Sequence, residues 1–321
     1  MTSPTSRRAM PATDEAARLA PEQWRAREAR HHERTDSLLA DHLRRRSAGV
    51  AHPVEDFLFS YYSHKPAHLR RWHPGPGTVL LDAPPERTRE RWHREVRTCD
   101  AEPPGAVLDT GAFLERRGPT VEFVAALLRA TNSRPAHLGC FGLHEWAMVY
   151  RLGPEDVRHA SVPLRLGAEG TDRVVDTHTI RCSHYDAYRF FTPEAHGRNR
   201  LRPTREGQPE QEQPGCLHAG MDVYKWAYKL APAVPGELVL DSFELARDIR
   251  ALDMRASPYE LRAYGYDPVP IETPEGKAAY IEAQRGFTER AKGLRERLLR
   301  VCDALLGTAP HNAVRPEPGA A

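Results

Sequence analysis

Apolar side chains recur at helical spacing along several segments of the chain, and most of these segments carry helix start or stop signals. Pro21 and Pro274 stand where a first helical turn tolerates proline, whereas Pro232 and Pro235 separate two consecutive helices. The pattern therefore predicts a mainly helical protein. The expected helices cover residues 21–49, 52–77, 119–130, 171–178, 216–230, 236–253 and 272–306.

Three other segments favour strands. TVLLDA (78–83) and VPLRL (162–166) are short and rich in aliphatic residues, and TIRCSHYDAYRFF (179–191) alternates between two side-chain sets. In the last segment, alternation places His184 and Asp186 on the same face. We expect an α+β fold that is predominantly helical, with a small sheet containing 179–191, in a single compact domain.

The domain boundaries follow from composition. Both chain ends are rich in Ser, Pro, Ala and charge without periodicity, and they are predicted to be disordered tails. One internal stretch is charged and flanked by prolines, which indicates a surface insertion, and another is a polar loop of lid-like length. The tails are 1–20 and 307–321, the domain is 21–306 with its core at 52–306, the insertion is 84–105 and the loop is 192–215.

Composition narrows the class of protein. The 321 residues are 40% apolar and 28% charged, and the formal net charge is 46 − 44 = +2, so no overall field favours nucleic acid. No apolar run reaches the length of a membrane span. The cysteines are odd in number without a C-x-x-C pair, and the N-terminus lacks the apolar core of a secretory signal. We expect a cytoplasmic protein of undetermined oligomeric state that makes no membrane contact.

Three apolar segments each place a histidine beside a carboxylate. In the segment 216–230 the spacing is i to i+4, which brings both groups to one face of a helix. Imidazole and carboxylate together bind zinc and non-haem iron, and the same pairing also makes a general base. We therefore hypothesise that the three histidines converge. The pairs are His144 with Glu145, His184 with Asp186, and His218 with Asp222.

One hypothesis from these residues is a divalent metal, whether zinc, iron or manganese, held by His184, His218 and Asp222. His144 or Glu145 would then act as acid or base. The zinc signature H-E-x-x-H is absent, since the position that would need the second histidine is a methionine. A satisfied structural network of hydrogen bonds is the alternative.

Two further polar groups bear on function. The first half of the loop 192–215 carries four arginines, which favours a lid that grips an anion, although a plain surface loop would look the same. At the end of the helix 236–253, Asp253 and Arg255 could form a buried ion pair. The loop arginines are Arg198, Arg200, Arg202 and Arg205.

Four long motifs resemble a known family. They are CFGLHEWAMVYR, IRCSHYDAYRFFTPEA, QPGCLHAGMDVYKWAYKL and LDMRASPYEL, and the likeness runs from about His52 to Leu305. In these the chain resembles a family of actinobacteria, cyanobacteria and plants that is named 3-methyladenine DNA glycosylase. Neither a helix-hairpin-helix motif nor the Cys/His zinc set of the bacterial type I enzyme is found in the sequence.

The resemblance implies hydrolytic excision of an alkylated purine from DNA, a reaction that needs a carboxylate, a base-stacking pocket and cationic contacts to phosphate. It implies catalytic roles for Glu145, Asp186 and His144, with Asp222 as a further candidate carboxylate. The four loop arginines would hold the DNA backbone. The aromatic residues that would stack on the base are Trp146, Tyr185, Tyr188 and Trp226.

Two other functions stay open. The first is a metal-dependent enzyme that acts on a small anionic molecule, with the metal ligands named above. The second is a non-catalytic interaction protein whose histidines are structural. The expected partner is therefore DNA if the resemblance holds, and otherwise a small anionic substrate.

Overall fold

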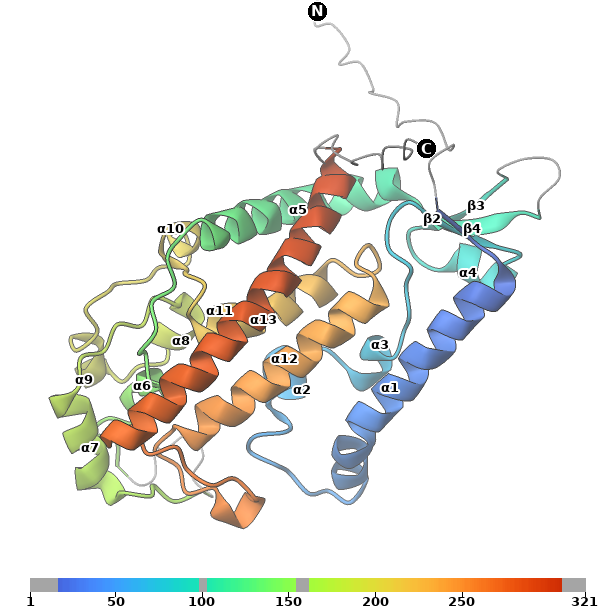
Figure 1. Cartoon of the computed structure of the whole chain (residues 1–321). Helices are drawn as coiled ribbons and strands as arrows, with labels where there is room; N and C mark the ends of the chain where they lie inside the picture. The colour runs from blue at the N-terminus through green and yellow to red at the C-terminus, as the bar shows by residue number, and fades with distance from the viewer. Residues whose placement is uncertain (1–16, 98–102, 154–161, 308–321) are drawn as a thin grey trace, which may run out of the picture.

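Long helices form the core of the protein, which is described here from a computed structural model covering residues 17–97, 103–153 and 162–307. Helices α11 and α12 pack against each other, and α13 packs on α5, α11 and α12 (Figure 1). The longer helices are α1 (Pro21–Ser47), α5 (Thr110–Asn132), α7 (Gly167–Thr177), α11 (Leu217–Lys229), α12 (Gly236–Arg255) and α13 (Pro274–Leu306).

Short helices connect these long ones, and four of them, α6, α8, α9 and α10, lie with α7 at the left of Figure 1. They are α2 (Phe57–Tyr61), α3 (Pro66–Leu69), α4 (Pro85–Arg89), α6 (Leu143–Ala147), α8 (Tyr185–Tyr188), α9 (Pro193–His196), α10 (Gln208–Gln211) and the 3₁₀ helix η3 (Arg262–Tyr264).

A small mixed sheet lies at the opposite end of the molecule (Figure 1). Its four strands follow the order β1-β2-β4-β3. Strand β1 runs parallel to β2, and the other neighbours are antiparallel. The fold is thus α+β, predominantly helical and compact, as the sequence predicts. The strands are β1 (Ala17–Leu19), β2 (Thr78–Leu81), β3 (His93–Val96) and β4 (Gly105–Leu108).

The helix ends follow local chemistry. Thr273 begins α13 by accepting a hydrogen bond from the Gly276 amide at 3.1 Å, and Pro274 occupies the first turn. Asp109 accepts from the Ala112 amide at 3.0 Å and starts α5 earlier than the expected 119–130. Pro119 consequently lies inside the helix.

Helix α1 is attached to the core by charge as well as by apolar contacts. Arg34 donates to Asp241 and Glu244 of α12, at 2.7 Å in both cases, and Arg27 forms an ion pair with Glu237 at 2.9 Å. These pairs are partly exposed to solvent. The attachment of α1 therefore depends in part on electrostatic attraction that salt screens.

The expected composition of the sheet is right for 78–83, which contributes β2, and wrong for two other segments. The segment 179–191 forms only an isolated bridge between Ile180 and Asn199 before the chain turns into α8 at Tyr185. The segment 162–166 likewise forms a single bridge, between Leu164 and Tyr259. Ile180 and Cys182 are buried in the main core, and Val162 packs with Tyr259 and Leu261. The apolar residues of these segments therefore reflect burial instead of pairing in a sheet.

Three other expectations need correction. The segment 52–77 is not one helix, because Ser63 has a left-handed backbone (φ 54°) and Pro66 disfavours helical geometry in the residue before it. The stretch 84–105 contains α4 and β3, and so belongs to the sheet end of the fold. The predicted N-terminal tail is too long, since Ala17–Leu19 pair with β2. The remainder of that tail and residues 308–321 of the other lie outside the described residues.

In the described part of the chain, no helix combines the length and the apolar character that crossing a bilayer requires.

The start of α13 provides a test of the packing. A Cβ at Gly276 would lie 2.0 Å from the Pro270 carbonyl oxygen, whereas a Cβ at Gly293 of the same helix meets nothing within 4 Å. We expect Gly276→Ala to lower the free energy of unfolding by about 1–3 kcal/mol through the clash. Gly293→Ala should raise it by roughly 0.5–1 kcal/mol, because alanine favours helix. Urea denaturation followed by circular dichroism measures both; equal effects would contradict the close contact.

Candidate functional site

The short helix α6 places His144 and Glu145 in the protein interior. Every residue of α6 is buried, and the helix follows Gly142, which has a left-handed backbone (φ 62°). Glycine readily adopts this left-handed conformation, and it lies close to the end of α12, where a Cβ would be in ordinary contact, 3.4 Å from the Asp253 carboxylate. The contact between α6 and α12 forms the first half of the site.

His144 and Asp253 form a buried pair in which His144 Nε2 lies 3.1 Å from Asp253 Oδ2. Burial alone would lower the pKa of His144, but the Asp253 carboxylate outweighs it and the pKa is raised. Burial alone would raise the pKa of Asp253, and His144 instead holds it down at about 2. Asp253 Oδ1 is buried with no hydrogen-bond partner among the described residues, which leaves one carboxylate oxygen available to a ligand.

The negative charge of Glu145 is compensated by Arg250, which lies on the same face of α12 as Asp253. Arg250 Nη1 donates to Glu145 Oε1 at 2.7 Å and lies 3.6 Å from Asp253 Oδ2. The guanidinium also lies over the Phe57 ring, 3.9 Å from its centroid. Arg250 therefore neutralises two buried carboxylates and is itself enclosed on its apolar face.

His218 lies between the other two histidines. Its ring centroid is 4.4 Å from that of His144 and 5.2 Å from that of His184. The predicted convergence of three sequence-distant histidines is therefore confirmed. Burial lowers the pKa of His218 well below its usual value, and the neighbouring His144 acts in the same direction. A neutral imidazole is the form that binds metal ions or accepts a proton.

The second half of the site is a network around Asp222 of α11. Its carboxylate accepts from Lys225 Nζ at 2.9 Å and from the Tyr62 hydroxyl at 3.1 Å, and it lies 3.3 Å from His184 Nε2. Burial raises the pKa of Asp222, but Lys225 outweighs it and the pKa falls well below its usual range. Lys225 also binds Asp186 at 2.9 Å. Asp186 is thus linked to the site through the lysine.

The side chains best placed to share a metal ion differ from the expected ones. His144, His218 and Asp253 each offer a ligand atom, and these atoms lie within 4.8 Å of one another. His184 and Asp222, which were expected to be ligands with His218, instead contact each other. Asp253 supplies the carboxylate of the group, and the expected ion pair between Asp253 and Arg255 is not formed, because Arg255 donates to the Asp267 carbonyl oxygen.

A cavity of about 20 Å³ adjoins His144 and His218. This is roughly the volume that one water molecule needs. Three thiols share its wall, and burial raises their pKa values, that of Cys182 to about 12, so they stay neutral. The exposed Arg181 also borders the cavity and marks its side toward solvent. The three cysteines are Cys140, Cys182 and Cys216.

The predicted aromatic residues lie away from this cavity. Trp146 is fully buried and donates to the Ala256 carbonyl oxygen at 2.9 Å, and Trp226 is 8% exposed and packs edge-on against Phe123. Tyr185 and Tyr188 are half-buried. None of the four borders the cavity beside His144 and His218.

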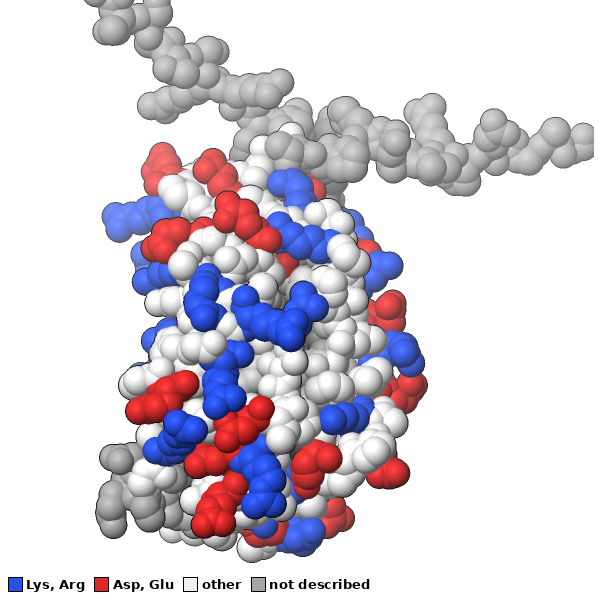
Figure 2. All heavy atoms as spheres, turned by 90° about the vertical axis from the view of Figure 1, so that its left-hand side faces the viewer, with Lys and Arg blue, Asp and Glu red and all other residues white. Residues whose placement is uncertain are grey.

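The loop 192–215 contacts the site at both ends. The Arg200 amide donates to the Ile180 carbonyl oxygen at 3.0 Å, and Gln213 borders the cavity. Glu212, which the sequence did not single out, lies 4.0 Å from His184. Figure 2 shows basic side chains gathered near the middle of the face that carries α7 and α9, with acidic ones above and below.

The four loop arginines have different environments. Arg198 donates to the Tyr150 hydroxyl at 2.9 Å and pairs with Asp176, and Arg202 donates to the Asn199 carbonyl oxygen. Arg200 and Arg205 are exposed. Only the last two are therefore at hand for a solvent-borne anion without breaking a contact of the fold.

Sequence reasoning missed the cations of the site. Lys225 stands three positions after Asp222, a spacing that brings two residues together on a helix, and it is one of few lysines in the chain. That spacing was an available signal. Arg250 and Tyr62 had no comparable local signal, because their partners Glu145 and Asp222 lie 105 and 160 positions away in the sequence.

Comparison with known proteins gives no match: no family model, no curated protein and no solved structure is similar to this chain.

The buried Glu145–Arg250 pair generates a stability prediction. Arg250→Met removes the cation that faces two buried carboxylates, and we expect it to lower the free energy of unfolding by about 3–5 kcal/mol. The double variant Glu145→Gln/Arg250→Met should recover part of that loss, because one stranded charge is gone. Arg285→Met, at a pair whose side chains are 60% and 78% exposed, is the control and should change little. Guanidinium denaturation measures the free energy of unfolding of all three variants. A loss for Arg250→Met no larger than the control's would show that Arg250 does not compensate the buried carboxylates.

Proposed function

We propose that the protein is a metal-dependent enzyme that hydrolyses a small anionic molecule, with His144, His218 and Asp253 as metal ligands. The observation that carries the proposal is that one ligand atom of each side chain lies within 4.8 Å of the other two, and that Asp253 Oδ1 is buried without a partner among the described residues. Two histidines and one carboxylate are a common ligand set of catalytic zinc and non-haem iron, which keep coordination positions open.

The distances support a metal at this place. Ligand bonds of 2.0–2.2 Å in a tetrahedral site separate neighbouring ligand atoms by about 3.3–3.6 Å. His144 Nε2 and Asp253 Oδ2 are already 3.1 Å apart. A divalent ion would thus replace the hydrogen bond between them with little movement, and the cavity of about 20 Å³ would hold the metal-bound water.

The remaining residues have roles around the metal. Asp222 contacts His184 and holds its ring in place, as carboxylates commonly do for catalytic histidines. A metal held there would lower the pKa of its bound water and so supply the nucleophile for hydrolysis, and His184, whose ring centroid lies 5.2 Å from that of His218, would hold that ligand in position. Arg250 and Glu145 would fix the position of Asp253 from the opposite side.

The anionic character of the substrate follows from the rim of the cavity. Arg181 borders it, and the exposed Arg200 lies on the segment that bonds to Ile180, the residue before Arg181. Because the cavity has room for little more than water, the substrate would approach from the solvent side and present its scissile bond to that water. Arginine suits phosphate or carboxylate groups there.

Base excision, implied by the family resemblance, is the second candidate. It is supported by Asp222, a carboxylate held ionised beside His184, and by the basic side chains of the face in Figure 2. In that case Asp222 would stabilise the cationic sugar of the transition state. The stacking role would fall to Tyr185 or Tyr188, since Trp146 is enclosed by the core.

Metal analysis of the purified protein tests the proposal. Protein loaded with zinc, iron or manganese and then dialysed should retain a stoichiometric amount, and His218→Ala and Asp253→Asn should each lose one equivalent. His178→Ala is the matched control, because His178 lies outside the group, and it should lose none. Inductively coupled plasma mass spectrometry gives the stoichiometry. Equal metal content in all four proteins would refute the site, and a metal-free protein that still releases 3-methyladenine from DNA would favour base excision.

A further inference from the structure

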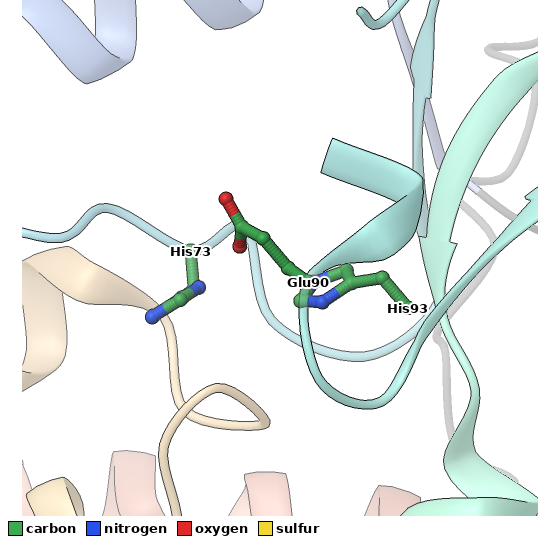
Figure 3. A group of neighbouring side chains, drawn as sticks. All are labelled: His73, Glu90 and His93. Atoms are coloured by element: carbon green, nitrogen blue, oxygen red, sulfur yellow. The ribbon is translucent and has the colours of Figure 1, made fainter. Parts of the chain in front are cut away.

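A second group of possible metal ligands lies at the sheet end of the fold, far along the chain from the buried site. His73, Glu90 and His93 each offer a ligand atom, and these atoms lie within 4.8 Å of one another. Figure 3 shows the three side chains facing one another, with His73 on the segment after α3 and the other two at the turn between α4 and β3. The group is independent of the function proposed above.

Local structure holds the two residues of the turn together. The His93 amide donates to the Glu90 carbonyl oxygen at 3.0 Å, which closes a tight turn, and Trp92 within it has a left-handed backbone (φ 65°). His93 Nδ1 lies 3.3 Å from the Arg91 carbonyl oxygen. That contact leaves Nε2 available, which is the arrangement seen in metal-ligating histidines whose other nitrogen is fixed by a carbonyl.

His73 provides the observation that points to a ligand. Its Nδ1 atom is buried and has no hydrogen-bond partner among the described residues. A buried polar atom without a partner costs free energy, so its retention in a group with a second imidazole and a carboxylate needs a reason. A bound metal ion would supply the missing partner. Within the described residues, the Glu90 carboxylate accepts only a long contact of 3.4 Å from Arg87, which leaves it able to bind an ion.

The group opens onto a cleft of about 1030 Å³. This differs from the buried site, whose cavity holds about one water. Three basic residues on the cleft wall, Arg71, Arg91 and Lys229, form no ion pair within the described residues. A metal with open positions beside unpaired cations is suited to an anion that binds both at once.

We propose that His73, Glu90 and His93 form a second metal site, at which a divalent transition metal and the cations of the cleft together bind the phosphate group of a small molecule. The positive charge of the cleft disfavours binding of the metal ion alone, and a bound anion offsets this repulsion. Metal and phosphate should therefore bind cooperatively, each raising the affinity for the other by the same factor.

Cobalt(II) is the probe for the metal, because its visible absorption reports coordination. The full-length protein is loaded with Co²⁺ in the presence of phosphate, dialysed against phosphate, and assayed for bound metal. We expect His93→Ala and Glu90→Gln each to lose one equivalent relative to the wild type. His68→Ala, which alters an exposed histidine of the same cleft, should lose none. Circular dichroism confirms that each variant is folded.

The number of bound metal equivalents distinguishes this site from the buried one. His218→Ala should keep the cleft equivalent whether or not the buried site binds metal, and His218→Ala/His93→Ala should keep none. Unchanged metal content in both His93→Ala and Glu90→Gln would overturn the second site and would leave the proposed function untouched.

Phosphate binding tests the second part of the proposal, that the metal and the cleft cations bind a phosphate group together. Orthophosphate and phenyl phosphate are titrated into Co²⁺-loaded protein, and the tighter ligand shows whether free phosphate or a phosphate ester is preferred. We expect a change in the Co²⁺ spectrum, a Co²⁺ affinity raised by about 5-fold or more, and weaker phosphate binding in Arg91→Gln. A spectrum and a Co²⁺ affinity that do not respond to either anion would overturn the phosphate assignment.

Discussion

The buried pairing of Asp253 with His144 is the contact on which the arrangement of the site depends. A carboxylate in the interior needs compensation, and α12 brings Asp253 and Arg250 one helical turn apart toward α6. Gly142 provides the left-handed turn from which α6 starts. The position of His144 is thereby determined, and His218 from α11 packs against its ring.

The packing of α11 on α12 extends this arrangement to the rest of the cluster. Helix α11 carries His218, Asp222 and Lys225 on successive turns, so that one helix serves both halves of the site. Lys225 then compensates Asp222 in the way that Arg250 compensates Glu145. Each of the two cations thus compensates two carboxylates, and His144 and His184 each contact one carboxylate of these two sets. A site of this kind is rigid, because moving one side chain would leave a buried charge without its partner.

The sequence predicted the long helices well and the irregular segments poorly. Helices α11, α12 and α13 were expected within two residues of their ends, because proline and threonine signals mark their boundaries locally. The segment 179–191 misled because alternating apolar residues also arise where an extended chain is buried on both sides. At 52–77 the apolar spacing was helical, but the left-handed Ser63 depends on tertiary contacts that spacing does not encode.

For the site, the sequence indicated which histidines matter but not their partners. Histidines in apolar segments stood out, whereas Asp253 lies 109 positions from His144 and its role arises only in the folded chain. His73 and His93 gave no signal, since both lie among charged residues, His73 in a segment expected to be helical and His93 in the expected surface insertion. Proximity across the chain is a product of helix packing, and single-sequence patterns report only local neighbours.

The charged attachment of α1 has a consequence for the cleft. Trp24, Glu28 and His32 of α1 line one wall of it, so the width of the cleft depends on how firmly α1 is held. The attachment of α1 includes the partly exposed ion pairs of Arg27 and Arg34 with α12. Added salt screens these pairs, so we expect the width of the cleft to depend on ionic strength. In hydrogen-exchange terms, α1 would form a separate cooperative unit whose opening free energy falls with added salt while that of the α11–α12 core stays constant.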